Sequence, residues 1–137
     1  QAYGLYAAKS YADRMGLPDS PEDFAGHAFV GSDDASMRAP FNKWLRQTVD
    51  EDAIRFRSSE SRALELAVTE GAGIGFLPLW EAARHDDLLE VMPPLDGWVV
   101  QMWLVTHVDL HRTVKVQTLL SWLKDKARAW GGEGLHA

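Results

Sequence analysis

The sequence predicts an α/β domain, built on a mixed sheet of about five strands flanked by helices. Short apolar segments rich in β-branched and aromatic residues alternate along it with segments whose apolar residues recur every three to four positions. The chain has 137 residues, 46% of them hydrophobic, which suits one domain with a buried core. Strands that alternate with helices favour an α/β sheet over a helical bundle or a β-sandwich.

Most predicted strands are short and apolar, whereas the strand at 53–59 alternates and the strand at 98–107 is long, and most predicted helices have a start signal, a stop signal or an apolar face. A helix at residues 10–16 ends at Gly16, and a helical turn at 20–26 has Ser20 at its N-cap and Pro21 at its first position. In order, the predicted strands are 3–8, 27–31, 53–59, 73–78, 88–93 and 98–107, and the predicted helices are 10–16, 20–26, 61–71, 79–87 and 112–130.

The two longest helices have clear apolar faces. The helix at 61–71 places Leu64, Ala67 and Val68 on one side. The final helix carries an apolar stripe, formed by Val116, Leu119, Leu120, Leu123, Ala127 and Trp130.

Three glycines fall within five positions in "EGAGIGFLP", residues 70–78. A dinucleotide-binding motif follows a strand and opens a helix, whereas here the helix comes first and the strand follows. We therefore expect structural roles for the glycines. Gly71 suits a left-handed helix cap, and Gly75 lies in a strand where a missing side chain lets a neighbour approach.

The composition excludes several functions. The net charge of −6 does not favour nucleic-acid binding by this part of the protein. The chain has no cysteine, no apolar run long enough to span a membrane and no signal peptide, so we expect a cytoplasmic protein.

We find no catalytic motif, and we expect neither an enzyme nor a cofactor. His107, Asp109 and His111 have ligand-like spacing, but they lie where a strand passes into a helix, so we predict no metal site. Glu60 and Glu65 would form a general acid–base pair only in a buried pocket.

The stretch "FRSSES", residues 56–61, ends a strand and opens a helix. Ser58 and Ser59 offer hydroxyl groups, and the free N–H groups and dipole of the helix start favour an anion. A small carboxylate or another anion is therefore a candidate ligand. One of the serines can also serve as the N-cap, and the two roles are compatible.

Four segments together resemble the effector-binding domain of LysR-type bacterial transcriptional regulators. They are "LYAAKSYADRMGLPDSPEDFAGHAFV", "FRSSESRALELAVTEGAGIGFLP", "LLEVMPPL" and "VQMWLVTHVDLHRTVKVQTLLSWL". The resemblance covers most of the chain except residues 32–52.

The resemblance implies the fold of type 2 periplasmic binding proteins, in which two α/β subdomains are joined by two crossover strands. Residues 1–106 would form mostly the second subdomain, with crossover strands near 3–8 and 98–106. Residues 107–130 would form a C-terminal helix that packs on the first subdomain, and 131–137 a flexible tail. Most of the first subdomain would be absent.

The resemblance also implies a site and a function. Three parts of this chain would face the cleft: the turn Ser58, Ser59 and Glu60, the loop Phe76, Leu77 and Pro78, and, less directly, Ser32. A small-molecule effector bound there would control transcription, and DNA would be bound only by an N-terminal winged helix that this sequence lacks.

Alternatives remain open: a solute-binding protein of a transport system has the same fold, and an enzyme could use the same scaffold. The apolar stripe of the final helix, left uncovered, also predicts self-association of the chain as a dimer or larger oligomer.

Overall fold

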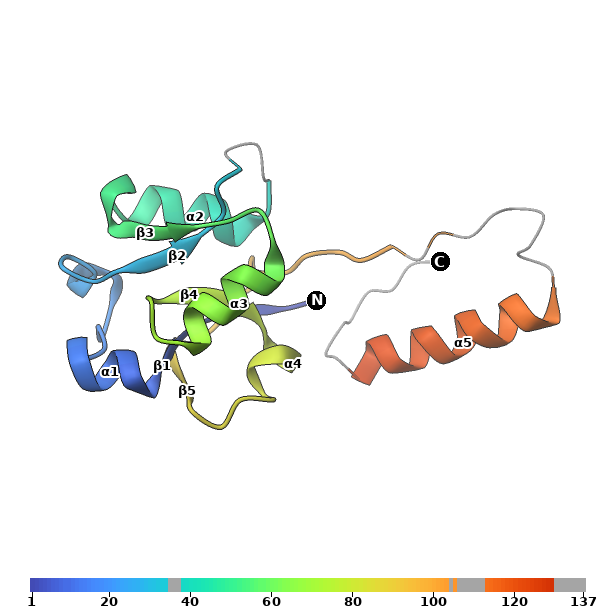
Figure 1. The fold of residues 1–137 in the computed structure, drawn as a ribbon. Coiled ribbons are helices and arrows are strands. Elements are labelled where there is room, and N and C mark those ends of the chain that lie inside the picture. The colour runs from blue at the N-terminus through green and yellow to red at the C-terminus, as the bar shows by residue number, and fades with distance from the viewer. Residues whose placement is uncertain (35–37, 104, 106–112, 130–137) are drawn as a thin grey trace.

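The computed structural model describes residues 1–34, 38–103, 105 and 113–129. The elements, shown in Figure 1, are β1 (Tyr3–Ala8), α1 (Lys9–Met15), η1 (Pro21–Asp23), β2 (Phe29–Gly31), α2 (Pro40–Thr48), η2 (Glu51–Ala53), β3 (Ile54–Arg57), α3 (Ser61–Thr69), β4 (Gly75–Pro78), α4 (Leu79–Ala82), β5 (Leu88–Met92) and α5 (Val114–Ala129). The predicted α/β class and most of the predicted elements are confirmed.

The strands form one three-stranded and one two-stranded sheet that are linked at a single point. β1 lies between β4 and β5 and runs antiparallel to both, whereas β2 and β3 are parallel. An isolated parallel bridge joins Phe29 to Ile74, and Val30 N donates to Ile74 O at 2.8 Å. The strands therefore follow the order β3-β2-β4-β1-β5, which confirms a mixed sheet of about five strands.

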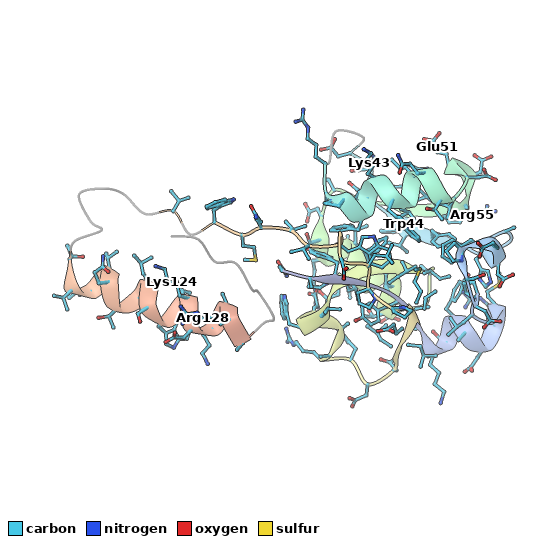
Figure 2. The ribbon with its side chains drawn as sticks, turned by 180° about the vertical axis from the view of Figure 1, so that it is seen from behind. Lys43, Trp44, Glu51, Arg55, Lys124 and Arg128 are labelled. Carbon is cyan, nitrogen blue, oxygen red and sulfur yellow. The ribbon has the colours of Figure 1, made fainter. Side chains whose placement is uncertain are left out.

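Helices cover both faces of this sheet. On one face, α3 packs through Ala67 and Val68 against Val30 and Leu77. On the other face, α2 contributes Trp44 and its neighbours to a larger core that is rich in aromatic residues. Figure 2 shows Trp44 directed from α2 towards the sheet and Lys43 directed away from it.

The structure corrects the sequence prediction in two places. A helix, α2, forms within residues 32–52, for which no element was predicted. The strand predicted at 98–107 does not form in the part of it that the structure describes, where Val99 makes only an isolated antiparallel bridge with Ala2. The pairing ends at Val100, which exchanges hydrogen bonds with Gln1, so the high β-propensity of residues 101–103 is not matched by a neighbouring strand.

The C-terminal helix is set apart from the sheet. α5 begins at Val114 and ends at Ala129, close to the predicted bounds. Figure 1 shows it beside the rest of the chain rather than against the sheet, and Leu120 is its only buried residue among those described.

Gly71 and Gly75 have the predicted roles. Gly71 has φ +82°, and α3 ends in a Schellman motif in which Gly71 N donates to Val68 O and Ala72 N to Ala67 O. A Cβ at Gly75 would lie 2.6 Å from Val68 Cγ2, so the missing side chain lets α3 lie close to β4.

Replacing Gly71 by Ala is expected to destabilise the chain more than replacing Gly16 by Ala. Both glycines have positive φ, but a Cβ at Gly71 would also lie 2.5 Å from Ser10 Oγ, whereas nothing lies within 4 Å at Gly16. We expect the free energy of unfolding, measured by urea denaturation, to fall by about 1 kcal/mol for Gly16→Ala and by about 2 kcal/mol for Gly71→Ala. Equal losses would show that the contact with Ser10 contributes nothing.

Candidate functional site

The candidate site is the edge of the sheet where three parallel strands end. β2 ends before Ser32, β3 ends before Ser58 and β4 ends at Pro78. Tyr3, at the start of the antiparallel β1, pairs with Pro78 and so lies at the same edge. The fold thus brings together polar and aromatic residues that are far apart in the sequence, as expected for a ligand-binding edge of an α/β sheet.

Residues 58–60, here called the serine turn, connect β3 to α3 by local hydrogen bonds. Ser58 N donates to Gly31 O at 3.2 Å, and Asp33 N donates to Ser58 O at 3.3 Å, which holds the turn beside the end of β2. Ser58 Oγ accepts from Glu60 N at 3.1 Å. Ser59 and Glu60 are exposed, so their side chains are accessible to a ligand at this edge.

The N-terminus of α3 is not capped by a side chain. Glu60 is the N-cap residue and has extended φ and ψ. Neither Ser58 nor Ser59 is the N-cap, so the capping role predicted for one of them is wrong. The first N–H groups of a helix have no partner within the helix, and the dipole adds partial positive charge. These N–H groups therefore remain suited to an anion next to the serine turn.

Ser32 is buried and takes part in a turn of its own. Its Oγ accepts a hydrogen bond from Asp34 N at 3.2 Å. Ser32 therefore lies beneath the surface at this edge. It is next to the serine turn because β2 and β3, which precede Ser32 and Ser58, are paired.

The three residues of the predicted Phe76–Pro78 loop point in different directions. Phe76 lies on the α2 face, where its ring centroid is 4.7 Å from that of Trp98 and 5.1 Å from that of Phe41. Leu77 is 2% exposed and packs in the core beneath α3, so its side chain is not at the surface. Pro78 is buried and serves as the N-cap of α4.

Aromatic residues that the sequence analysis did not assign to the site also lie at this edge. Phe41, in the first turn of α2, stacks on Tyr3 with ring centroids 4.3 Å apart. Burial, and secondarily the charge of Glu81, raises the pKa of Tyr3, so its hydroxyl group stays protonated at neutral pH.

The sequence did contain a signal for α2. Pro40 stands at the first helical position, and Phe41, Trp44 and Leu45 follow at helical spacing.

The two predicted crossover segments leave the body together at the same edge. Gln1 and Val100 exchange two backbone hydrogen bonds, both of 2.8 Å, and Tyr3 N donates to Trp98 O at 2.9 Å. Figure 1 shows the N-terminus and residues 99–103 on the side of the molecule where α3 begins. A second body attached through these segments would therefore face the serine turn.

Other candidates for chemistry do not form a site in the described part of the chain. There, no three His, Cys, Asp or Glu residues gather closely enough to hold a metal ion, and no helix is long and apolar enough to cross a membrane. His107, Asp109 and His111 lie outside the described residues. Glu60 and Glu65 do not pair, because Glu65 is bound to Arg62 and lies near His85.

Comparison with known proteins gives one family. Residues 2–128 match the model of the LysR substrate binding domain. No curated protein matches the chain. Nothing in these comparisons favours a transport protein.

Solved structures with the same fold are regulators of the LysR type. The regulatory domain of CrgA from Neisseria meningitidis is 19% identical with a TM-score of 0.64, and the match covers 90% of this chain and 64% of that one. The longer CrgA structure is 18% identical with a TM-score of 0.64, covering 91% and 44%. The regulatory domain of AphB from Vibrio vulnificus, treated with cumene hydroperoxide, is 21% identical with a TM-score of 0.50, covering 67% and 49%. The chain thus spans less than two thirds of each of these structures.

Proposed function

The chain belongs to the LysR substrate-binding domain family, and we propose that it is the greater part of the effector-sensing domain of a cytoplasmic DNA-binding transcriptional regulator. In this proposal it provides mostly the second subdomain, residues 1–106 with the crossover segments near 3–8 and 98–106. The final helix, within 107–130, packs on the first subdomain, and residues 131–137 follow as a tail. The domain binds a small molecule and carries out no catalysis. DNA is bound by another part of the protein.

One observation carries this proposal: the two crossover segments leave the body beside the serine turn. The paired Gln1 and Val100 mark the point where the chain passes to a second body, and Tyr3 and Pro78 lie next to that point. A ligand between the two bodies would contact the N-terminus of α3. The site we propose consists of Ser58, Ser59, Glu60, Phe76 and Pro78, with Leu77 and Ser32 supporting it from behind.

The chemistry of this edge favours a small carboxylate. Uncapped N–H groups at the start of α3 and the hydroxyl groups of Ser58 and Ser59 suit a negative group. Phe76, which makes edge-to-face contacts with Trp44 and Trp98, and the stacked Tyr3–Phe41 pair offer an apolar surface beside it. This combination of a few polar anchors with an apolar wall is typical of small-ligand pockets.

Ligand binding would act by shifting the population of subdomain arrangements. A ligand that contacts both bodies binds best to the arrangement in which both sets of contacts form, and it stabilises that arrangement by its differential affinity. The changed arrangement would alter how the regulator presents its DNA-binding parts.

The experiment that tests this function uses the complete protein that contains this chain. A panel of small carboxylates and aromatic compounds is first screened by thermal shift, because a ligand of the native state raises the melting temperature. A ligand found in this way is expected to change the DNA footprint or bend of the complete protein. An unchanged footprint and bend at saturating ligand would contradict the proposed function, and turnover of a ligand would point to an enzyme instead.

We also propose that the chain self-associates through α5. Val114, Leu119 and Trp122 are exposed apolar residues along this helix, and Figure 1 shows it apart from the sheet. An exposed apolar patch of this kind favours association. Light scattering of the 137-residue chain should give a mass above that of a monomer, and Trp122→Glu should lower it. A monomer at high concentration would contradict this proposal.

A further inference from the structure

A hollow lies at the edge of the sheet opposite to the serine turn. Its volume is about 380 Å³, and the residues that line it include Met15, His27, Asp50, Asp52 and Arg55. Because β2 and β3 are parallel, the connections that precede them meet at one edge, whereas Ser32 and Ser58 follow them at the other. Figure 2 shows Arg55 on the side of the molecule away from Lys124 of α5.

A buried tyrosine fixes the orientation of His27 in this hollow. Tyr11 is 0% exposed, and its hydroxyl oxygen accepts a hydrogen bond from Ala28 N at 3.0 Å. The same hydroxyl group lies 2.8 Å from His27 Nδ1, and it donates its single proton there when the imidazole is neutral. The proton of the neutral ring is then on Nε2, which has no hydrogen-bond partner among the residues that the structure describes. His27 therefore supplies an N–H donor that is available to a ligand.

The charged side chains of the hollow carry both signs, yet they do not pair with one another. Asp50 is the N-cap residue of η2, but its carboxylate makes no capping hydrogen bond. Within the described part of the chain, the side chains of Asp50, Asp52 and Arg55 form no hydrogen bond or ion pair. Arg57, two residues further along β3, differs, because its guanidinium group donates to Glu51 O at 2.7 Å. Two carboxylates and one guanidinium group thus remain available in the hollow.

Charges of both signs favour a ligand that also carries both. Asp50 and Asp52 would repel a ligand with a carboxylate alone, and Arg55 would repel a ligand with an ammonium group alone. A metal ion is not favoured, since among the described residues no three His, Cys, Asp or Glu side chains gather closely enough to hold one. Small-ligand sites have volumes of about 300–1,000 Å³, so the hollow has room for a small organic zwitterion.

We propose that this hollow is a second ligand site, which binds a free α-amino acid. Asp50 and Asp52 bind its ammonium group, and Arg55 and His27 Nε2 donate hydrogen bonds to its carboxylate. Met15, whose exposed thioether side chain adapts to many shapes, contacts the side chain of the amino acid. The site does not depend on the proposed function, because it uses neither the serine turn nor the crossover segments.

The test uses the complete protein that contains this chain and the standard free amino acids, each added singly in a thermal-shift assay. At least one is expected to raise the melting temperature, and titration calorimetry then gives its affinity. The N-acetyl derivative of that amino acid lacks the ammonium charge, and its amide lacks the carboxylate. Each derivative should bind about tenfold or more weakly than the parent, and Arg55→Gln and Asp52→Asn should weaken binding of the parent by a similar factor.

Arg84→Gln and Asp86→Asn are the matched controls. Both residues are exposed and lie between α4 and β5, whereas β3 is at the other end of the strand order. Arg55 and Asp52 are exposed as well, so none of the four substitutions should change the melting temperature of the protein without ligand. The two control variants should bind the amino acid as the wild type does.

The outcomes separate this site from the serine turn. Binding that Arg55→Gln weakens and Ser59→Asp leaves unchanged supports the second site, whether or not a carboxylate effector binds elsewhere. If Ser59→Asp weakens binding and Arg55→Gln does not, the amino acid lies at the serine turn and the proposal is wrong. The proposal is also wrong if no amino acid binds, or if the N-acetyl derivative and the amide bind as tightly as the parent.

Discussion

Replacing Trp98 by Ala is expected to lower the free energy of unfolding by about 3–5 kcal/mol, the cost typical of removing a large buried aromatic side chain. Trp98 is 2% exposed, and its ring centroid lies 4.7 Å from that of Phe76 and 5.0 Å from that of Trp44. Its carbonyl oxygen also accepts the hydrogen bond from Tyr3 N at the crossover. Urea denaturation followed by circular dichroism measures the loss.

Trp103→Ala is the matched control for this prediction. Trp103 lies five residues further along the chain and is 63% exposed, so its removal should change the free energy of unfolding by less than about 0.5 kcal/mol. Equal effects of the two substitutions would mean that Trp98 does not anchor the start of the return crossover.

Replacing Ser59 by Asp is expected to weaken carboxylate binding by about tenfold or more. The new carboxylate would lie at the uncapped N-terminus of α3. There it would offset the partial positive charge of the helix dipole and repel an anionic ligand. The same charge should stabilise the helix by about 0.3–1 kcal/mol, so the chain should melt at the same or a higher temperature. Calorimetric titration with a carboxylate found by thermal shift measures the affinity.

Ser20→Asp is the control for the charge itself. Ser20 lies in the connection between α1 and β2, and β2 begins at the other edge of the sheet, away from the serine turn. The control should bind the ligand as the wild type does. If Ser59→Asp also binds normally, the ligand does not lie at the start of α3.

Local signals in the sequence were enough to predict most of the helices and strands. The cap at Gly71 and the close packing at Gly75 could be predicted because helix termination and strand packing depend on neighbouring residues. The helix α2 was missed although Pro40 and the spacing of Phe41 and Trp44 indicated it. The strand at 98–107 was predicted from β-propensity, but a strand also needs a neighbouring strand, and in the described part of 98–107 the pairing with the N-terminal residues ends at Val100.

The site could be located only in part. The serine turn could be predicted because it connects a strand to a helix. It lies where β3 ends, at the carboxyl ends of the parallel strands, as expected. The inward direction of Leu77 depends on which face α3 covers, and Glu65 contacts Arg62 and His85 rather than Glu60. Such contacts are set by tertiary packing, which the sequence pattern does not specify.

Hydrogen exchange of the complete protein, with and without a saturating ligand, tests the central claim most directly. Exchange reports the protection of individual backbone amides, so it locates the ligand without assuming its pose. Binding at the proposed site predicts slower exchange at residues 58–64 and 76–79, with residues 15–28 unchanged. Protection confined to residues 15–28 and 50–55, at the opposite edge of the sheet, would contradict the account.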